Sequence, residues 1–460
     1  MAIDLNQTRI DPQDAKLQKL FQNLQGNILK SHGRKFSTQL LFNFKPTTDT
    51  AATRQGVRAL TEKFVTSAAK QFAEREALHT QNIPGGTFGN LFLSASGYQH
   101  LGISKQELDK GFAGQTSFLQ GMAQAVNVGD DTSQWEPPYQ GKRIDAMLLL
   151  ADSDPERLRA QMHAALGLLE GFATVLQQEE GQVLLNQDKQ HIEHFGYVDG
   201  VSQPLFLESD ITEAGDKSRW DPSATLALAL VKDPHTTDED AFGSFFVFRK
   251  LQQDVKGFKA REEELATRLG LEGENRALAG AMAVGRFRDG TPVTLSSHGA
   301  DNLREFNDFD YGNKKKDDAA DLDGLKCPFH SHIRKTNPRG DSARLISGVT
   351  LESEREHRIV RRAIPYGSPE LSEPVGLLFM CFQSDLEKQF VFMQQSWANN
   401  SGFVQTKVGL DPLVGQGEGS QLWSKKWDGP RTESFDFQGF IKMRGGEYFF
   451  TPSLAFLLSL

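Results

Sequence analysis

The order in which strand-like and helix-like segments follow one another restricts the fold of this chain more than any other feature. Residues 36–44 (FSTQLLFNF) alternate as a strand does, and residues 51–74 have the pattern of a helix. Further strands are expected at 90–96 and at 145–152. The first half of the chain therefore begins with the order β-α-β-β.

An amphipathic helix follows the last of these strands. Asp154 is its expected N-cap and Pro155 its first residue, a position where no backbone N–H is needed. A similar order returns later, with a strand at 243–251, helices over 252–285 and a buried strand at 375–383 before another helix. We therefore expect an α+β fold of two ferredoxin-like lobes, each an antiparallel sheet packed with helices.

The length of the chain also favours two lobes. A chain of 460 residues is too long for one ordinary hydrophobic core. A polar, turn-rich stretch over 210–240 marks the boundary, so we place the lobes at 1–215 and 216–460. A second polar insert, 306–324, mixes both charge signs and is interpreted as a solvated loop.

Composition excludes several classes of protein. The net charge of -9 argues against a nucleic-acid partner, and no apolar run is long enough to span a membrane. The N-terminus has neither a basic start nor an apolar stretch, so we expect a cytoplasmic protein. Two cysteines, Cys327 and Cys381, make neither a disulfide framework nor a four-thiolate metal site. The 33 phenylalanines, against 5 tryptophans and 6 tyrosines, indicate an unusually apolar interior.

Asp199 lies in a turn-rich segment, FGYVDGVSQP. Gly196 and Gly200 flank it and Pro204 closes the segment, so the carboxylate is held on a stiff corner with little cover. An Asx-type turn would account for these residues. A site that needs one fixed carboxylate would account for them as well.

The segment 327–339, CPFHSHIRKTNPR, offers a different chemistry. His330 and His332 would share one side of a strand but diverge on a helix. A zinc site lacks a fourth ligand here. A haem instead needs one axial imidazole and cations for its propionates, which His332 could supply together with Arg334, Lys335 and Arg339.

Two further segments carry candidate residues. HIEH at 191–194 could hold a metal or form a polar surface strand. RIVRRAIPYG at 358–367 places at least one arginine in an apolar context, where it needs an anion, although a solvated basic turn is an equally good interpretation. The following strand presents Leu377, Phe379 and Cys381 on one face.

These segments together resemble the dye-decolorizing peroxidase family. The similarity runs through nearly the whole chain and includes, besides the segments above, LQGNILKSHGR at 24–34, GLLFMCFQSD and GGEYFFTPS at 445–453. The resemblance implies a haem peroxidase with one haem b per chain, held in the C-terminal lobe. It also implies that hydrogen peroxide is reduced while dyes and other aromatic donors are oxidised.

The resemblance also implies roles for individual residues. Asp199 corresponds to the distal acid-base residue and His332 to the proximal iron ligand. Arg361, four residues before the proline of IPYG, corresponds to the distal arginine, and Asp436 in SFDFQGF to the carboxylate that binds the proximal imidazole. The further residues expected at the haem are Arg334, Leu377 and Phe379.

Several alternatives stay open from the sequence. A haem-binding or haem-delivery protein would need His332 but neither Asp199 nor Arg361, and a scaffold protein would use every motif for packing only. A narrow pocket would require large donors to pass electrons from the surface. The aromatic candidates for that relay, each of which has a plainer interpretation as a packing residue, are Trp220, Trp397, Tyr311 and Tyr366. The sequence is also compatible with a homo-oligomer.

Overall fold

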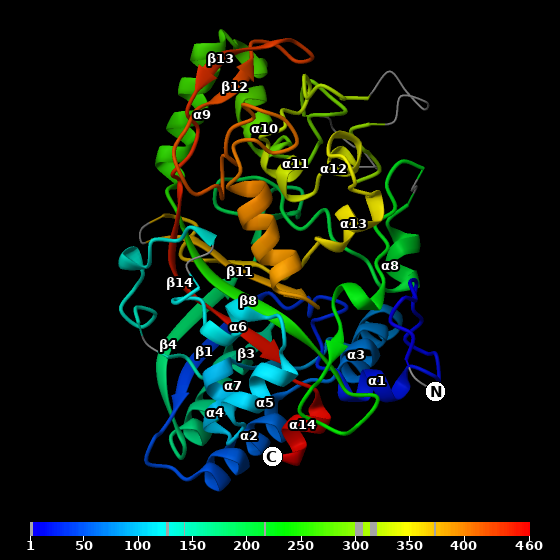
Figure 1. Cartoon of the computed structure of the whole chain (residues 1–460), viewed down its shortest axis with the longest axis vertical. Coiled ribbons are helices and arrows are strands. Elements are labelled where there is room, and N and C mark those ends of the chain that lie inside the picture. Colours follow the sequence, from blue (N-terminus) through cyan, green and yellow to red (C-terminus); the bar gives the residue numbers. More distant parts are fainter. Residues whose placement is uncertain are drawn as a thin grey trace.

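The computed structural model describes residues 3–125, 128–141, 143–215, 218–299, 307–312, 320–371 and 374–460. Its centre is a sheet of ten strands (Figure 1). Eight of them follow the order β10-β11-β8-β14-β2-β3-β1-β4, and the other two, β7 and β9, pair with β8 and β11. The strands of this sheet are β1 (Phe36–Phe44), β2 (Phe88–Leu93), β3 (Ala146–Asp152), β4 (Ala173–Gln182), β7 (Val231–Lys232), β8 (Phe242–Gln253), β9 (Val360–Arg361), β10 (Ile364–Tyr366), β11 (Gly376–Gln383) and β14 (Ile441–Thr451).

Two small hairpins and a set of helices complete the described part of the chain. The hairpins are β5 (Leu184–Leu185) with β6 (His191–Ile192), and β12 (Gln421–Ser424) with β13 (Arg431–Phe435). The α-helices are α1 (Gln18–Asn23), α2 (Thr50–Phe64), α3 (Ala68–Gln81), α4 (Ala95–His100), α5 (Lys105–Gly111), α6 (Thr116–Gln120), α7 (Pro155–Leu169), α8 (Glu208–Glu213), α9 (Val255–Leu269), α10 (Ala277–Val284), α11 (His332–Thr336), α12 (Asp341–Leu345), α13 (Leu351–Glu356) and α14 (Leu454–Ser459). Two π-helical stretches, Glu387–Val391 and Met393–Ala398, form one further helical segment.

Both halves of the large sheet have the ferredoxin-like strand order, which confirms the α+β class expected from the sequence. In the first half, β2-β3-β1-β4 places the second, third, first and fourth strands side by side, and β10-β11-β8-β14 repeats that order in the second half. Every pairing between these strands is antiparallel. The proposed lobe boundary after residue 215 falls between β4 and β8.

The two halves share one sheet rather than forming separate layers. At one seam β14 pairs with β2 through Phe450 and Leu93. At the other seam β4 and β10 lie against each other, and Gly181 leaves the room that the side chain of Ile364 occupies. The fourth strand of one half therefore meets the second strand of the other half at both seams, so the sheet curves back toward itself.

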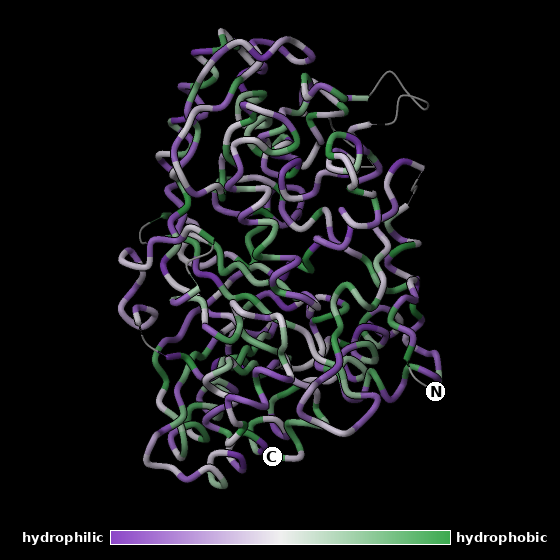
Figure 2. Tube along the Cα trace, in the orientation of Figure 1, coloured by the Kyte–Doolittle hydropathy of each residue, from purple (hydrophilic) through white to green (hydrophobic). Residues whose placement is uncertain are grey.

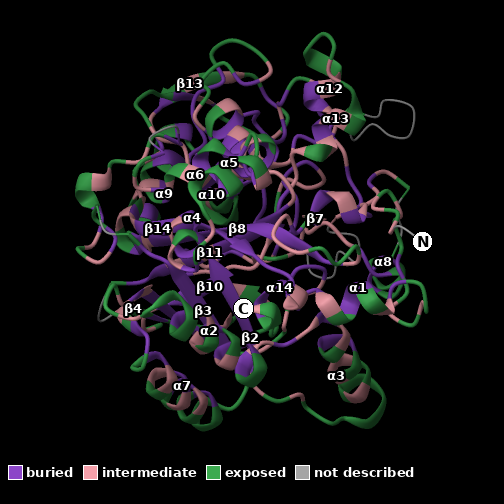
Figure 3. Ribbon diagram, turned by 60° about the horizontal axis from the view of Figure 1, so that its bottom comes forward, coloured by how far each residue is buried: buried purple, intermediate pink, exposed green. Residues whose placement is uncertain are grey.

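The interior of the molecule is apolar along this shared sheet. The strands are largely buried, whereas exposed residues lie mainly on the outer helices and loops (Figure 3). A second apolar cluster packs α9 and α10 against the β12–β13 hairpin, and apolar runs are visible along the strands and α10 in Figure 2. Within the described residues, no helix is both long and apolar enough to cross a membrane.

Two expected helices have different bounds in the structure. The helix expected over 51–74 is two helices, because the Ser67 side chain accepts a hydrogen bond from the Lys70 N–H and starts α3 anew. The helix after Asp154 ends at Leu169, and β4 follows. The Asp154 cap is confirmed, since its side chain accepts from Glu156 and Arg157 N–H groups.

Candidate active site

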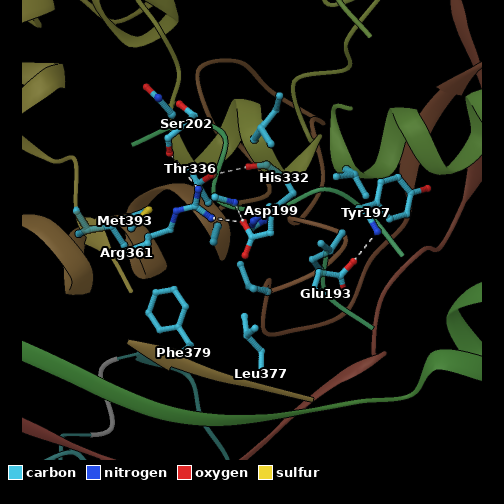
Figure 4. Close-up of a pocket in the computed structure, with 18 of the residues that line it drawn as sticks. Glu193, Tyr197, Asp199, Ser202, His332, Thr336, Arg361, Leu377, Phe379 and Met393 are labelled. Atoms are coloured by element: carbon cyan, nitrogen blue, oxygen red, sulfur yellow. Dashed lines mark hydrogen bonds and ion pairs between the residues drawn. The ribbon is translucent and has the colours of Figure 1, made fainter. Parts of the chain in front are cut away.

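A pocket lies between the second half of the sheet and the helices that cover it. Its floor follows the two-residue period of strands: Arg249 and Leu251 of β8 stand opposite Phe379 and Leu377 of β11. The other walls come from the hairpin that follows β6, from α11 and from the π-helical segment. Leu377 and Phe379, two of the residues expected at the haem, therefore line this pocket (Figure 4).

Asp199 enters this pocket from a short hairpin. The Asp199 N–H donates to the His191 carbonyl at 2.9 Å, and Ile192 bridges to Val198. Gly196 and Gly200 have φ values of +94° and +78°, which most side chains avoid. The glycines seen in the sequence therefore serve a tight turn, and that turn presents one carboxylate to the pocket.

Arg361 of β9 forms an ion pair with Asp199. Arg361 Nη1 donates to Asp199 Oδ1 at 2.9 Å, and Nη2 donates to the Ser202 carbonyl at 3.0 Å. The Gly200 N–H also donates to Oδ1, at 2.6 Å. Burial raises the pKa of Asp199, but Arg361 and these hydrogen bonds outweigh burial, so the pKa lies below its ordinary value.

His332 is the first residue of α11, and its ring is held by Asp411. His332 Nδ1 and Asp411 Oδ2 are 2.9 Å apart, while Asp411 Oδ1 accepts from the N–H groups of Leu413 and Val414. Burial raises the pKa of Asp411, but the His332 ring and these N–H groups lower it further, so the net shift is downward. Asp411 is therefore ionised, and His332 Nε2 has no protein partner among the described residues.

The prediction that Asp436 binds the proximal imidazole is wrong. The carboxylate at His332 belongs to Asp411, and the Asp436 carbonyl accepts hydrogen bonds from Arg261. Asp436 follows β13, beside α9. The one signal for Asp411 in the sequence is an aspartate before proline in GLDPLVG, which is typical of a turn with side-chain-to-backbone bonds.

The prediction that Arg334 lies at the haem is also wrong. On α11 a spacing of two residues turns side chains to different faces, so Arg334 points away from the pocket that His332 lines. It is fully buried and pairs with Asp321 at 2.7 Å and Asp341 at 2.6 Å. Lys335 likewise donates to backbone carbonyls.

The other histidine candidates do not line the pocket. His330 is fully buried and packs edge-on against Trp423, with ring centres 4.4 Å apart. The distance between His194 Nε2 and the Tyr366 carbonyl oxygen is 2.8 Å. His191 is exposed. Across the part of the chain that the structure describes, no group of three or more His, Cys, Asp or Glu side chains could hold a metal ion.

The imidazole and the cationic side chains of the pocket match what a haem requires. Arg339 and Arg358 line it, and neither forms a salt bridge within the described ranges. Burial lowers the pKa of Arg339 to about 10 and that of Arg358 to about 9, because the acidic groups nearby offset the loss of solvent only in part. A free imidazole nitrogen on His332, apolar side chains on the floor and two guanidinium groups without a salt bridge in the described structure fit an iron porphyrin with two propionates.

The aromatic residues considered as electron relays are buried. Their exposed fractions are 8% or less, and Trp220 also lines the pocket; the residues are Trp220, Trp397, Tyr311 and Tyr366. Part of the insert at 306–324 lies outside the described residues.

Comparisons with known proteins agree with this geometry. Residues 23–183 match the family model "DyP dimeric alpha+beta barrel domain" and residues 310–406 match "Dyp-type peroxidase, C-terminal". The chain is 40% identical to the multifunctional dye peroxidase DyP2 of Amycolatopsis sp., over 96% of each sequence. It is 31% identical to a dye-decolorizing peroxidase of Mycena epipterygia, over 94% of this chain and 85% of the relative.

The solved structures point the same way. The DyP-type peroxidase of Anabaena sp. superposes with a TM-score of 0.92 at 42% identity, covering 99% of this chain and 98% of its own. DyP2 from Amycolatopsis sp. superposes with a TM-score of 0.89 at 40% identity, over all of both chains. The chain therefore belongs to the DyP-type peroxidases, and it is a hydrogen-peroxide-dependent oxidoreductase.

Proposed function

We propose that this chain binds one haem b in the pocket, reduces hydrogen peroxide there and oxidises dyes and other aromatic donors. The observation that carries the proposal is the Asp199–Arg361 ion pair, which lines the same pocket as His332. A haem-delivery protein needs an imidazole ligand but has no use for a carboxylate and a guanidinium fixed in the same pocket.

His332 would hold the iron through Nε2, and Arg339 and Arg358 would pair with the propionates. The bound haem supplies an iron that coordinates hydrogen peroxide and accepts the oxidising equivalents released when the O–O bond breaks. Asp411 keeps the proton on Nδ1, so that Nε2 faces the metal with its lone pair, and it fixes the plane of the ring.

Asp199 would move the proton. Its Oδ1 is occupied by Arg361 and Gly200, whereas Oδ2 has no partner in the described structure and is available to peroxide. The low pKa keeps this carboxylate ionised at ordinary pH. It can therefore accept a proton from hydrogen peroxide and return it to the oxygen that departs as water.

Arg361 would stabilise the negative charge that develops on the departing oxygen. Its guanidinium is already held by Asp199 and by the Ser202 carbonyl, so it need not reorganise during the reaction. Leu377 and Phe379 would keep the space beside it apolar and small.

We expect His332→Ala to abolish haem binding, because no other imidazole nitrogen of the described pocket is free. His330→Leu is the matched control: it changes a buried ring outside the pocket and should leave the Soret band in place. Absorption spectra after haem reconstitution measure both. Loss of the band in the His330 variant alone would contradict the assignment.

We expect Asp411→Ala to weaken haem retention by about 10- to 100-fold, the usual cost of removing the partner of a metal-bound histidine. Asp436→Ala should retain haem normally, since Asp436 contacts Arg261 rather than His332. The rate at which each variant loses haem to an acceptor protein measures its haem retention. The opposite order of effects would restore the role that the sequence suggested for Asp436.

We expect Asp199→Asn to slow the reaction with hydrogen peroxide by roughly 10²- to 10⁴-fold, because an amide cannot accept the proton. Haem content should be unchanged. Stopped-flow spectroscopy of the haem-loaded protein measures the rate. A wild-type rate in this variant would show that Asp199 is only a turn residue and that Arg361 carries the main burden.

We expect the wild-type rate of the peroxide reaction to hold into acidic solution and to fall only below about pH 4, where an aspartate titrates. The sign follows from the lowered pKa of Asp199: the ionised base is present above that pKa and is lost as the pH falls through it. Measured rates that already fall near neutral pH would point to a histidine base.

A further inference from the structure

The pocket contains a second carboxyl group, that of Glu193, whose surroundings differ from those of Asp199. Glu193 lines the pocket and closes its own turn, with Oε2 accepting from the Phe195 N–H at 2.8 Å and Oε1 from the Tyr197 N–H at 3.0 Å (Figure 4). Gln253 of β8 makes the third contact, 2.5 Å from Oε2. Among the described residues, Glu193 has no lysine or arginine partner.

The remaining ionisable groups near Glu193 do not neutralise it. On its own hairpin, Asp199 is an anion, and burial raises the pKa of the Tyr197 phenol well above its ordinary value, so Tyr197 stays neutral. On the neighbouring elements, the Arg288 guanidinium is paired with Glu262 of α9. A charged Glu193 would thus face a second carboxylate without a cation of its own.

We propose that Glu193 is a neutral carboxylic acid in the working enzyme, and that it is the proton-holding counterpart of the base Asp199. A neutral acid satisfies every contact of the turn. The hydroxyl oxygen still accepts from Phe195 and the carbonyl oxygen from Tyr197, while the O–H donates to the Gln253 amide oxygen once that amide rotates by half a turn.

The electrostatics agree with this assignment. Burial raises the pKa of Glu193 to about 7, and the charge of Asp199 adds to the rise, although the N–H donors oppose both. Asp199 shifts the other way because it has Arg361. Two carboxyl groups whose pKa values are driven apart in one pocket are suited to opposite roles, one as acid and one as base.

The role of Glu193 rests on the proposed peroxidase function. Converting one hydrogen peroxide to two waters consumes two electrons and two protons. The aromatic donor supplies the electrons, and Asp199 only relays a proton that peroxide already carries. Glu193 can release its own proton into the pocket as an electron arrives and recover it from solvent afterwards.

Infrared difference spectroscopy of the haem-loaded protein, from about pH 5 to about pH 9, tests the protonation state. We expect a protonated-carboxyl band in the wild type that disappears as the pH rises through about 7 and that is missing in Glu193→Gln. Identical difference spectra for the two proteins would mean that Glu193 neither loses nor gains a proton between these pH values and would overturn the proposal.

A second variant tests the coupling without changing Glu193. Asp199→Asn removes the neighbouring charge, so the midpoint of the Glu193 band should shift to lower pH. Glu447 is an internal control: burial raises its pKa to about 7 as well, but it does not line the pocket, and its band should not move. An unshifted Glu193 midpoint would contradict the proposal even if Glu193→Gln failed to fold.

Kinetics separate this proposal from the peroxidase assignment. Glu193→Gln should lower kcat for aromatic donors while the rate of the reaction with peroxide stays near that of the wild type, because Asp199 is intact. An unchanged kcat would remove the proton-supplying role. The infrared result does not depend on turnover, so the protonation of Glu193 and the peroxidase function can fail independently.

Discussion

The ion pair between Asp199 and Arg361 is the interaction on which the proposed chemistry depends. Asp199 comes from a hairpin that follows the first half of the sheet, and Arg361 comes from β9 in the second half. The pair therefore forms only when both halves are in place. Without that carboxylate, Arg361 would join Arg339 and Arg358 as a pocket cation that has no salt bridge among the described residues.

The shared sheet gives this pair a rigid base. Arg361 lies opposite Cys381 in the antiparallel pairing of β9 with β11, and β11 also carries the floor residues Leu377 and Phe379. On the other side, α11 begins at His332, whose ring is fixed by a buried carboxylate. The side chains of Asp199, Arg361 and His332 are thus held in place by rigid backbone elements. Electrostatic stabilisation of a transition state requires such fixed charges.

Much of the fold could be predicted from the sequence because its strands are regular. The expected strand at 36–44 is β1, and those at 145–152 and 375–383 match β3 and β11 to within one residue. Asp199 could be singled out because the glycines on either side of it indicate a tight turn with positive φ values. Local patterns carry such features, since the periodicity and the turn residues lie within the segment itself.

The misassigned residues depend on contacts that no local pattern records. Asp411 lies 79 positions from the His332 ring that it binds, and nothing near His332 indicates which carboxylate will reach it. Arg334 looked like a propionate partner because it is close in sequence, yet helical geometry turns it into a buried cluster with Asp321 and Asp341. The sequence shows Glu193 only as part of HIEH, a possible metal site, because the absence of a cation partner is not visible in a local pattern.

The central claim is that Asp199 and Arg361 act on hydrogen peroxide as one unit. A double-mutant cycle tests it most directly: stopped-flow rates with peroxide for the haem-loaded wild type, Asp199→Asn, Arg361→Lys and the double variant. We predict that each single change slows the reaction and that the double variant is much faster than the product of the two losses would give. Losses that simply multiply, or single variants that react at the wild-type rate, would contradict the account.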